Sequence, residues 1–234
     1  MKLVLWLFEI GYLLQHLATI LQIMRILNKK STELVSIDTN IIFLVTSIAK
    51  MFWIFDTMLR KMIISYIECL VALVSYSAII YLYYVYKKND FFEIEYKMPR
   101  FLRWYVILAI VLVLSFFFHP GSKGKYYLTM QMLVSVSIYG EALGLLPQLY
   151  ILKYTKDTGN VSQYYTVFLG FARIFRLLFW VQMYVSNSTF IWLMVADCLN
   201  TVLFGYFVFT YVKNWNNITL PTFGNAQVQT KKVF

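Results

Sequence analysis

Eight ionisable side chains lie inside long apolar stretches of this sequence, where charges are rare. They are Glu9, His16, Lys50, Glu68, Glu141, Arg173, Arg176 and Asp197. Such groups are costly to bury in a membrane, so they either pair with one another or form a functional site. Two interpretations stay open. The bases pair with Glu9, Glu141 or Asp197 and hold helices together, or Lys50, Glu141, Arg173 and Arg176 line a solvated pocket for an anionic ligand or lipid head group.

The chemistry that these residues favour is recognition and not catalysis. The sequence contains no nucleophile–base pair, no metal-ligand spacing and no phosphate-binding loop. We therefore expect neither an enzyme nor a bound cofactor or metal. Cys69 and Cys198 both lie in apolar runs, so we expect buried free thiols that say nothing of the redox compartment.

The composition shows what must position these residues. Of the 234 residues, 60% are hydrophobic and 14% charged, and the mean hydropathy is +0.64. Soluble domains are about half apolar and about a quarter charged. The apolar excess is too large for one water-facing globule, which excludes a soluble enzyme, a nucleic-acid-binding module and a disordered chain. The sequence is that of an integral membrane protein.

The apolar runs predict a bundle of seven transmembrane helices, because each span needs roughly 20 apolar residues. The expected spans are about 4–27, 39–59, 62–84, 101–118, 127–152, 165–185 and 190–212. The connections are short and the composition does not shift along the chain. We therefore expect a single all-α membrane domain over residues 1–234.

The basic residues predict the orientation of this bundle. Five Lys and Arg fall on the face that carries the N-terminus and thirteen on the opposite face, out of 21 in the chain. Because the more basic face stays on the cytosolic side, the C-terminus is predicted to be cytosolic, or in the matrix if the membrane is mitochondrial. This charge also suits anionic lipid head groups, and it leaves no reason to expect nucleic acid as a partner.

An internal repeat appears when the chain is displaced by 126 residues against itself. Lys50 then falls on Arg176, Gln22 on Gln148, and Gln15 on Glu141. The match at polar positions predicts two parallel three-helix repeats, residues 1–86 and 126–212, joined by a linker helix over 101–119 and followed by a tail at 213–234. In membrane carriers with parallel repeats, the functional site lies near the pseudo-symmetry axis.

The second repeat carries Leu146-Pro147-Gln148 near the predicted cytosolic end of its first span. Proline there interrupts the helical hydrogen bonds, and neighbouring groups must satisfy the freed backbone. With the repeat and the seven spans, this dipeptide resembles the PQ-loop superfamily.

Within that superfamily the chain resembles the KDEL receptors, the ER lumen protein retaining receptors. The resemblance is clearest in Ser137-Ile138-Tyr139-x-Glu141, Leu146-Pro147-Gln148-Leu149, Tyr165, Leu169-Gly170-x-x-Arg173 and Trp180. It implies a seven-helix bundle around a polar cavity that opens to the lumen. It also implies pH-dependent capture of a C-terminal Lys/His-Asp-Glu-Leu peptide, with coatomer-dependent retrieval from Golgi to ER.

The resemblance carries four ligand-binding residues over, namely Lys50, Glu141, Arg173 and Trp180, with Lys50 in place of an arginine. The other positions of the family's site differ here: Phe8, Gln15, Trp53, Ala172, Met183 and Tyr206 replace charged, titratable or aromatic residues. His16, next to the position of the pH-sensing histidine, is about 100° away on a helix. These losses predict a degenerate site for a peptide that carries two acids and a cation, since unpaired buried charges are costly.

The chain ends in Lys231-Lys232-Val233-Phe234. Lysines at the third and fourth positions from the end resemble the dilysine retrieval signal that coatomer recognises. This tail favours the endoplasmic reticulum and Golgi as the location.

Three functions remain open from the sequence. The first is a non-catalytic accessory subunit of a larger membrane assembly, in endomembranes or in a respiratory complex of the mitochondrial inner membrane, with membrane subunits as partners. The second is a divergent retention-signal receptor that cycles between Golgi and ER. The third is a small-solute carrier of the PQ-loop type.

Overall fold

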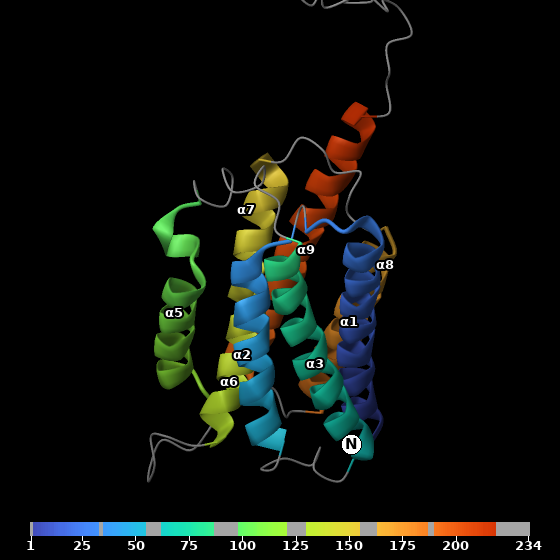
Figure 1. Cartoon of the computed structure of the whole chain (residues 1–234). Helices are drawn as coiled ribbons and strands as arrows, with labels where there is room; N and C mark the ends of the chain where they lie inside the picture. The colour runs from blue at the N-terminus through green and yellow to red at the C-terminus, as the bar shows by residue number, and fades with distance from the viewer. Residues whose placement is uncertain are drawn as a thin grey trace, which may run out of the picture.

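The computed structural model describes residues 2–32, 35–54, 62–86, 98–120, 130–154, 163–186 and 190–218, and in these ranges the chain is helical without a β-strand. The elements are α1 (Lys2–Lys29), α2 (Ile37–Ile54), α3 (Ile63–Val85), the short 3₁₀ helix η3 (Arg100–Leu102), α5 (Trp104–Phe117), α6 (Met130–Gly144), α7 (Leu146–Tyr154), α8 (Gln163–Val185) and α9 (Ile191–Ile218). Figure 1 shows them as a bundle of roughly upright helices.

Five helical stretches are long and apolar enough to cross a membrane: Leu5–Lys29, Ile63–Val85, Met130–Lys153, Val167–Val185 and Ile191–Thr210. They coincide with the first, third, fifth, sixth and seventh predicted spans. Helices α2 and α5 occupy the second and fourth predicted ranges. Helix α5 has 14 residues, fewer than the roughly 20 that a perpendicular span requires.

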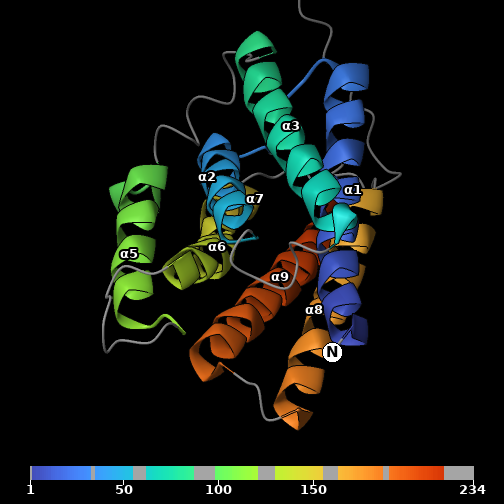
Figure 2. The ribbon, with the colours of Figure 1, turned by 90° about the horizontal axis from the view of Figure 1, so that it is seen from below.

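Helix α1 has neighbouring helices on two sides. Helix α1 packs between α3 and α8, α2 packs on α3 and α6, and α9 contacts α6 and α8. Figure 2 shows α5 at the edge, where it covers α6 and part of α2. Because partners cover α1 on more than one side, both Gln15 and His16 are buried. The two side chains are about 100° apart around the helix, and each meets a different neighbour in the interior.

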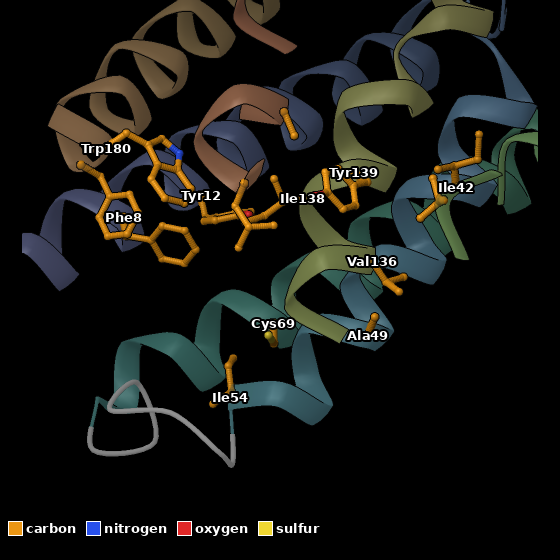
Figure 3. Packing of buried hydrophobic residues seen from close by; sticks show 14 of the residues in the cluster. Phe8, Tyr12, Ile42, Ala49, Ile54, Cys69, Val136, Ile138, Tyr139 and Trp180 are labelled. Carbon is orange, nitrogen blue, oxygen red and sulfur yellow. The ribbon is translucent and has the colours of Figure 1, made fainter. Parts of the chain in front are cut away.

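The largest group of packed apolar side chains lies where α1, α2, α6 and α8 converge. Figure 3 shows Phe8, Tyr12 and Trp180 close together at one end of this group and Val136, Ala49 and Ile42 at the other. The ring of Phe8 lies 4.8 Å from that of Tyr12 and 4.9 Å from that of Phe179, centroid to centroid. Aromatic pairs at this distance add to the stabilisation from burial.

The Pro-Gln dipeptide lies where the fifth predicted span is interrupted. Helix α6 ends at Gly144 and α7 begins at Leu146, with Pro147 in the first turn of α7, where its missing N–H costs little. The backbone N–H of Gln148 donates to Thr39 Oγ1 at 3.1 Å, and the side-chain oxygen of Gln148 accepts from the backbone N–H of Ser36 at 2.9 Å. These two bonds attach the residue after Pro147 to α2 and to the segment just before it.

Two glycines let α6 approach α2 closely. A Cβ atom at Gly140 would lie 2.1 Å from Cγ2 of Thr46, and one at Gly144 would lie 2.8 Å from Cγ2 of Ile42. They are four residues apart on one helix face, the spacing that brings membrane helices into close contact.

We expect Gly140→Ala to destabilise the protein by about 1–3 kcal/mol, because the new methyl group overpacks a filled interface. The measurement is the midpoint of thermal unfolding in detergent. Thr46→Ser removes the clashing methyl and keeps the hydroxyl that donates to Phe43 O at 2.9 Å, so it should rescue the variant. Gly205→Ala is the matched control, since a Cβ there meets nothing within 4 Å. An equal loss in the control, or no rescue, would contradict this prediction.

Candidate functional site

The buried ionisable side chains gather in two groups on either side of Tyr12. The first charge group consists of His16, Lys50 and Glu68, from α1, α2 and α3. The second consists of Glu141, Arg176 and Asp197, from α6, α8 and α9. All six side chains are at most 5% exposed, so each charge needs a partner inside the bundle.

In the first charge group a single carboxylate contacts two basic side chains. Lys50 Nζ lies 2.7 Å from Glu68 Oε2, and His16 Nε2 lies 2.5 Å from Glu68 Oε1. The sequence interpretation paired Lys50 with Glu9, Glu141 or Asp197, and the structure corrects this: the partner is Glu68. The reason is the packing of α2 on α3, which brings Lys50 and Glu68 together.

Glu9 adds a second acid on the same side of α1. It is fully buried and makes no ion pair within 4 Å among the residues that the structure describes. It precedes His16 by two helical turns, so both side chains lie on the same helix face. With Glu9 included, this part of the interior holds two acids, one lysine and one histidine.

In the second charge group one arginine contacts two acids. The guanidinium of Arg176 donates to Glu141 Oε2 and, from Nε, to Asp197 Oδ2 at 2.9 Å, and its Nη2 lies 2.8 Å from Asp197 Oδ1. Trp180 Nε1 also donates to Asp197 Oδ2, at 2.7 Å. Charge-assisted bonds of this kind are about twice as strong as neutral ones. The group ties α6, α8 and α9 together.

Arg173 lies one turn away on α8, and its environment differs from that of the other interior cations. It is 2% exposed, and its ion pair with Asp197 is long, at 3.9 Å. Its Nε and Nη1 atoms make no hydrogen bond with the described residues. A buried guanidinium with unused donors is a ready site for a carboxylate or another anion.

Tyr12 connects the two charge groups. Lys50 Nζ lies 3.2 Å from the centroid of its ring, and the guanidinium carbon of Arg176 lies 4.7 Å from it. Cations at such distances are attracted to the ring face. The sequence interpretation missed Tyr12, although its spacing to Glu9 and His16, three residues after one and four before the other, places all three on one helix face.

The four residues carried over by resemblance, Lys50, Glu141, Arg173 and Trp180, thus do not all contact one another. Glu141 and Trp180 meet through Arg176 and Asp197, Arg173 lies beside them, and Lys50 belongs to the other charge group across Tyr12. Gln15, at the expected place of the pH-sensing histidine, donates to the hydroxyl of Tyr76 at 3.3 Å. Lys231 and Lys232 lie outside the described residues.

The chain is similar in sequence to proteins of one known family. The sequence model of the family "ER lumen protein retaining receptor" matches residues 31–183. Similar proteins include an ER lumen protein-retaining receptor of Petunia hybrida, 36% identical over 85 residues, which are 36% of this chain and 40% of the relative. Receptor B of Arabidopsis thaliana is 28% identical over 123 residues, 52% of this chain and 54% of the relative.

ER lumen protein-retaining receptor 3 of Mus musculus matches more of the chain, at 24% identity over 209 residues, 87% of this chain and 90% of the relative. In the two plant receptors the match covers about half of the relative's length or less. The family match alone covers more than half of the chain. The chain therefore belongs to the ER lumen protein retaining receptor family.

Proposed function

We propose that this protein is a divergent receptor that retains proteins of the early secretory pathway by binding their C-terminal carboxylate at Arg173. The family membership supports the receptor class. The observation that carries the choice of residue is the environment of Arg173, whose Nε and Nη1 have no hydrogen-bond partner among the described residues although the side chain is buried.

The charges around Arg173 favour one anion at this place. Lys50 and Arg176 already have carboxylate partners within 3 Å, so a ligand anion gains little from either. Arg173 shares Asp197 with Arg176 and lies farther from it. A terminal carboxylate would supply the missing acceptors in bidentate geometry, and removing it would leave the donors unsatisfied again.

The distribution of basic residues defines the orientation that we propose for the bundle in its membrane. We place the N-terminal face in the lumen and the C-terminal face in the cytosol, because thirteen Lys and Arg lie on the latter and five on the former. The seven predicted spans then form two parallel repeats with α5 as the linker. Lys231 and Lys232 become accessible to coatomer, and anionic lipids lie against the basic face.

The test uses the full-length protein in nanodiscs. A hexapeptide library randomised over its last four positions is made once with a free carboxyl end and once amidated. We expect binding from the free-acid library only. Arg173→Gln should weaken this binding about 10-fold or more, since a hydrogen bond to a charged group is worth about 1.5–3 kcal/mol. Arg100→Gln, at an exposed arginine, is the matched control. Equal binding of both libraries would overturn the proposal.

A second function has one observation in its favour. Lys50 is neutralised by Glu68, and Arg176 by Glu141 and Asp197. This arrangement holds helices together without a ligand, as an accessory subunit of a larger membrane assembly would require. Gentle detergent extraction of the native protein, followed by sizing and mass spectrometry, separates the two functions. Stoichiometric co-migration with a large complex favours the subunit, whereas a lone particle of 27.7 kDa plus detergent excludes it.

A further inference from the structure

A cavity of about 200 Å³ lies between α1, α6, α8 and α9, beside the end of α1 that carries the N-terminus. Its walls include Leu5, Phe8, Val134, Ile138, Trp180 and Met183. None of the described residues that line it is charged, and Gln131 supplies the only side-chain amide. An apolar cavity of about 150 Å³ holds a molecule as large as benzene, so this one has room for one large apolar side chain.

One wall of the cavity belongs to α8, the helix that carries Arg173. Trp180 lines the cavity and follows Arg173 by seven residues, which is a rise of about 10 Å along α8. Arg176 occupies the turn between them. An extended peptide covers that distance in about three residues. A peptide whose terminal carboxylate contacts Arg173 therefore brings the fourth residue from its end to the level of the cavity.

The two ligand residues between the level of Arg173 and the level of the cavity would face a region of the protein whose charges are already paired. Arg176 is paired with Glu141 and Asp197, and across Tyr12 Lys50 is paired with Glu68. An acidic ligand side chain there would find, among the described residues, only cations that already contact a carboxylate, and it would lie near the acids that hold them. Buried charges without partners weaken binding strongly.

We propose that the peptide ligand of this receptor carries an apolar residue at the fourth position from its end and uncharged residues at the next two. The cavity binds the apolar side chain, and Arg173 binds the terminal carboxylate. This proposal rests on the proposed function and defines its ligand class: a C-terminal signal that is apolar and neutral where a Lys-Asp-Glu-Leu signal is charged.

Four defined peptides with free carboxyl ends test it, ending in Lys-Asp-Glu-Leu, Leu-Asp-Glu-Leu, Lys-Asn-Gln-Leu and Leu-Asn-Gln-Leu. The set changes the fourth position and the two middle positions independently. We expect the Leu-Asn-Gln-Leu peptide to bind the protein in nanodiscs at least about 10-fold more tightly than Lys-Asp-Glu-Leu, since burying one leucine side chain supplies that factor. Each single change should account for part of the gain.

Two variants of the cavity wall test whether the cavity causes the preference for leucine at the fourth position. Val134→Phe fills the cavity and should remove the preference for leucine at the fourth position, while binding still requires the free carboxyl end. Val113→Phe, at an exposed valine on α5, is the matched control. Met183→Trp, also in the cavity wall, replaces Val134→Phe if that variant unfolds.

The outcomes separate this proposal from the proposed function. Tighter binding of Lys-Asp-Glu-Leu, or equal binding of all four peptides, overturns the ligand class and leaves a carboxylate receptor in place. An unchanged preference in both cavity variants overturns the assignment to the cavity. Absence of binding by all four peptides, together with no difference between free and amidated libraries, overturns both proposals.

Discussion

Replacing Arg176 by methionine is expected to destabilise the folded protein by about 3–5 kcal/mol, because it leaves buried acids without their cation. The side chain is 1% exposed and contacts both Glu141 and Asp197. Arg173 can approach Asp197 from its present 3.9 Å, but Glu141 then has no close cation among the described residues. Methionine has a similar length and no charge, so the loss reports the charges more than the packing.

The measurement uses the two cysteines of the chain. Cys69 is buried as predicted, but the prediction that Cys198 is buried is wrong, since its position on α9 is exposed. A Cys198→Ser background therefore leaves one thiol that reacts with a fluorescent dye only on unfolding. At about 2–4 °C per kcal/mol, the midpoint for Arg176→Met should fall by roughly 6–20 °C. Arg176→Met with Glu141→Gln and Asp197→Asn should recover much of this loss, because the amides need no cation. An Arg176→Met midpoint equal to that of the Arg100→Met control would refute the structural role of the pair.

The helices could be predicted from hydropathy because a membrane imposes one simple requirement on a span. A long apolar run satisfies its backbone internally and faces lipid or protein with equal ease. For that reason the five long apolar helices fall where the sequence places them. The α6–α7 interruption was also predictable, since Pro147 removes a backbone donor whatever surrounds it. The close contact at Gly140 depends on Thr46 of another helix, and a single sequence does not reveal such a partner.

The pairing of the interior charges could be predicted only in part. Arg173, Arg176 and Trp180 follow the spacing of one helix face, so their proximity on α8 is readable from the sequence. The choice of partners is not, because it depends on how each helix is rotated against its neighbours. The partner of Lys50 is Glu68 of α3, whereas the sequence alone pointed to Glu9, Glu141 or Asp197.

The contact made by His16 also depends on the neighbours of α1. From the sequence alone, His16 lies about 100° from Gln15 around the helix, which does not identify its partner. Helix α1 has neighbours on both sides, so His16 contacts Glu68 while Gln15 contacts Tyr76. The histidine that the sequence interpretation considered lost thus has a counterpart in the interior, one residue later in the chain and in contact with Glu68.

Replacing Lys50 by methionine is expected to cost about as much stability as the loss of Arg176. Lys50 Nζ lies 2.7 Å from Glu68 Oε2, and both residues are buried. Without Lys50, the one remaining described basic side chain within 4 Å of Glu68 is His16. Glu9, a second buried acid, lies on the same side of α1.

The loss follows from the buried carboxylate of Glu68. We expect Lys50→Met to cost about 3–5 kcal/mol, as for a buried acid that has lost its partner. Methionine has a similar length and no charge, so the loss reports the missing charge more than the packing. The measurement is again the thiol reactivity of Cys69 in the Cys198→Ser background.

A double variant decides whether the unpaired Glu68 causes this loss. Lys50→Met with Glu68→Leu should recover much of the stability, since replacing a whole buried ion pair by apolar side chains is often neutral. Arg100→Met, at an exposed arginine, is the control for the loss of one positive charge. A Lys50→Met variant as stable as the parent protein, or a double variant no more stable than Lys50→Met, would contradict the role of Lys50 as the partner of Glu68.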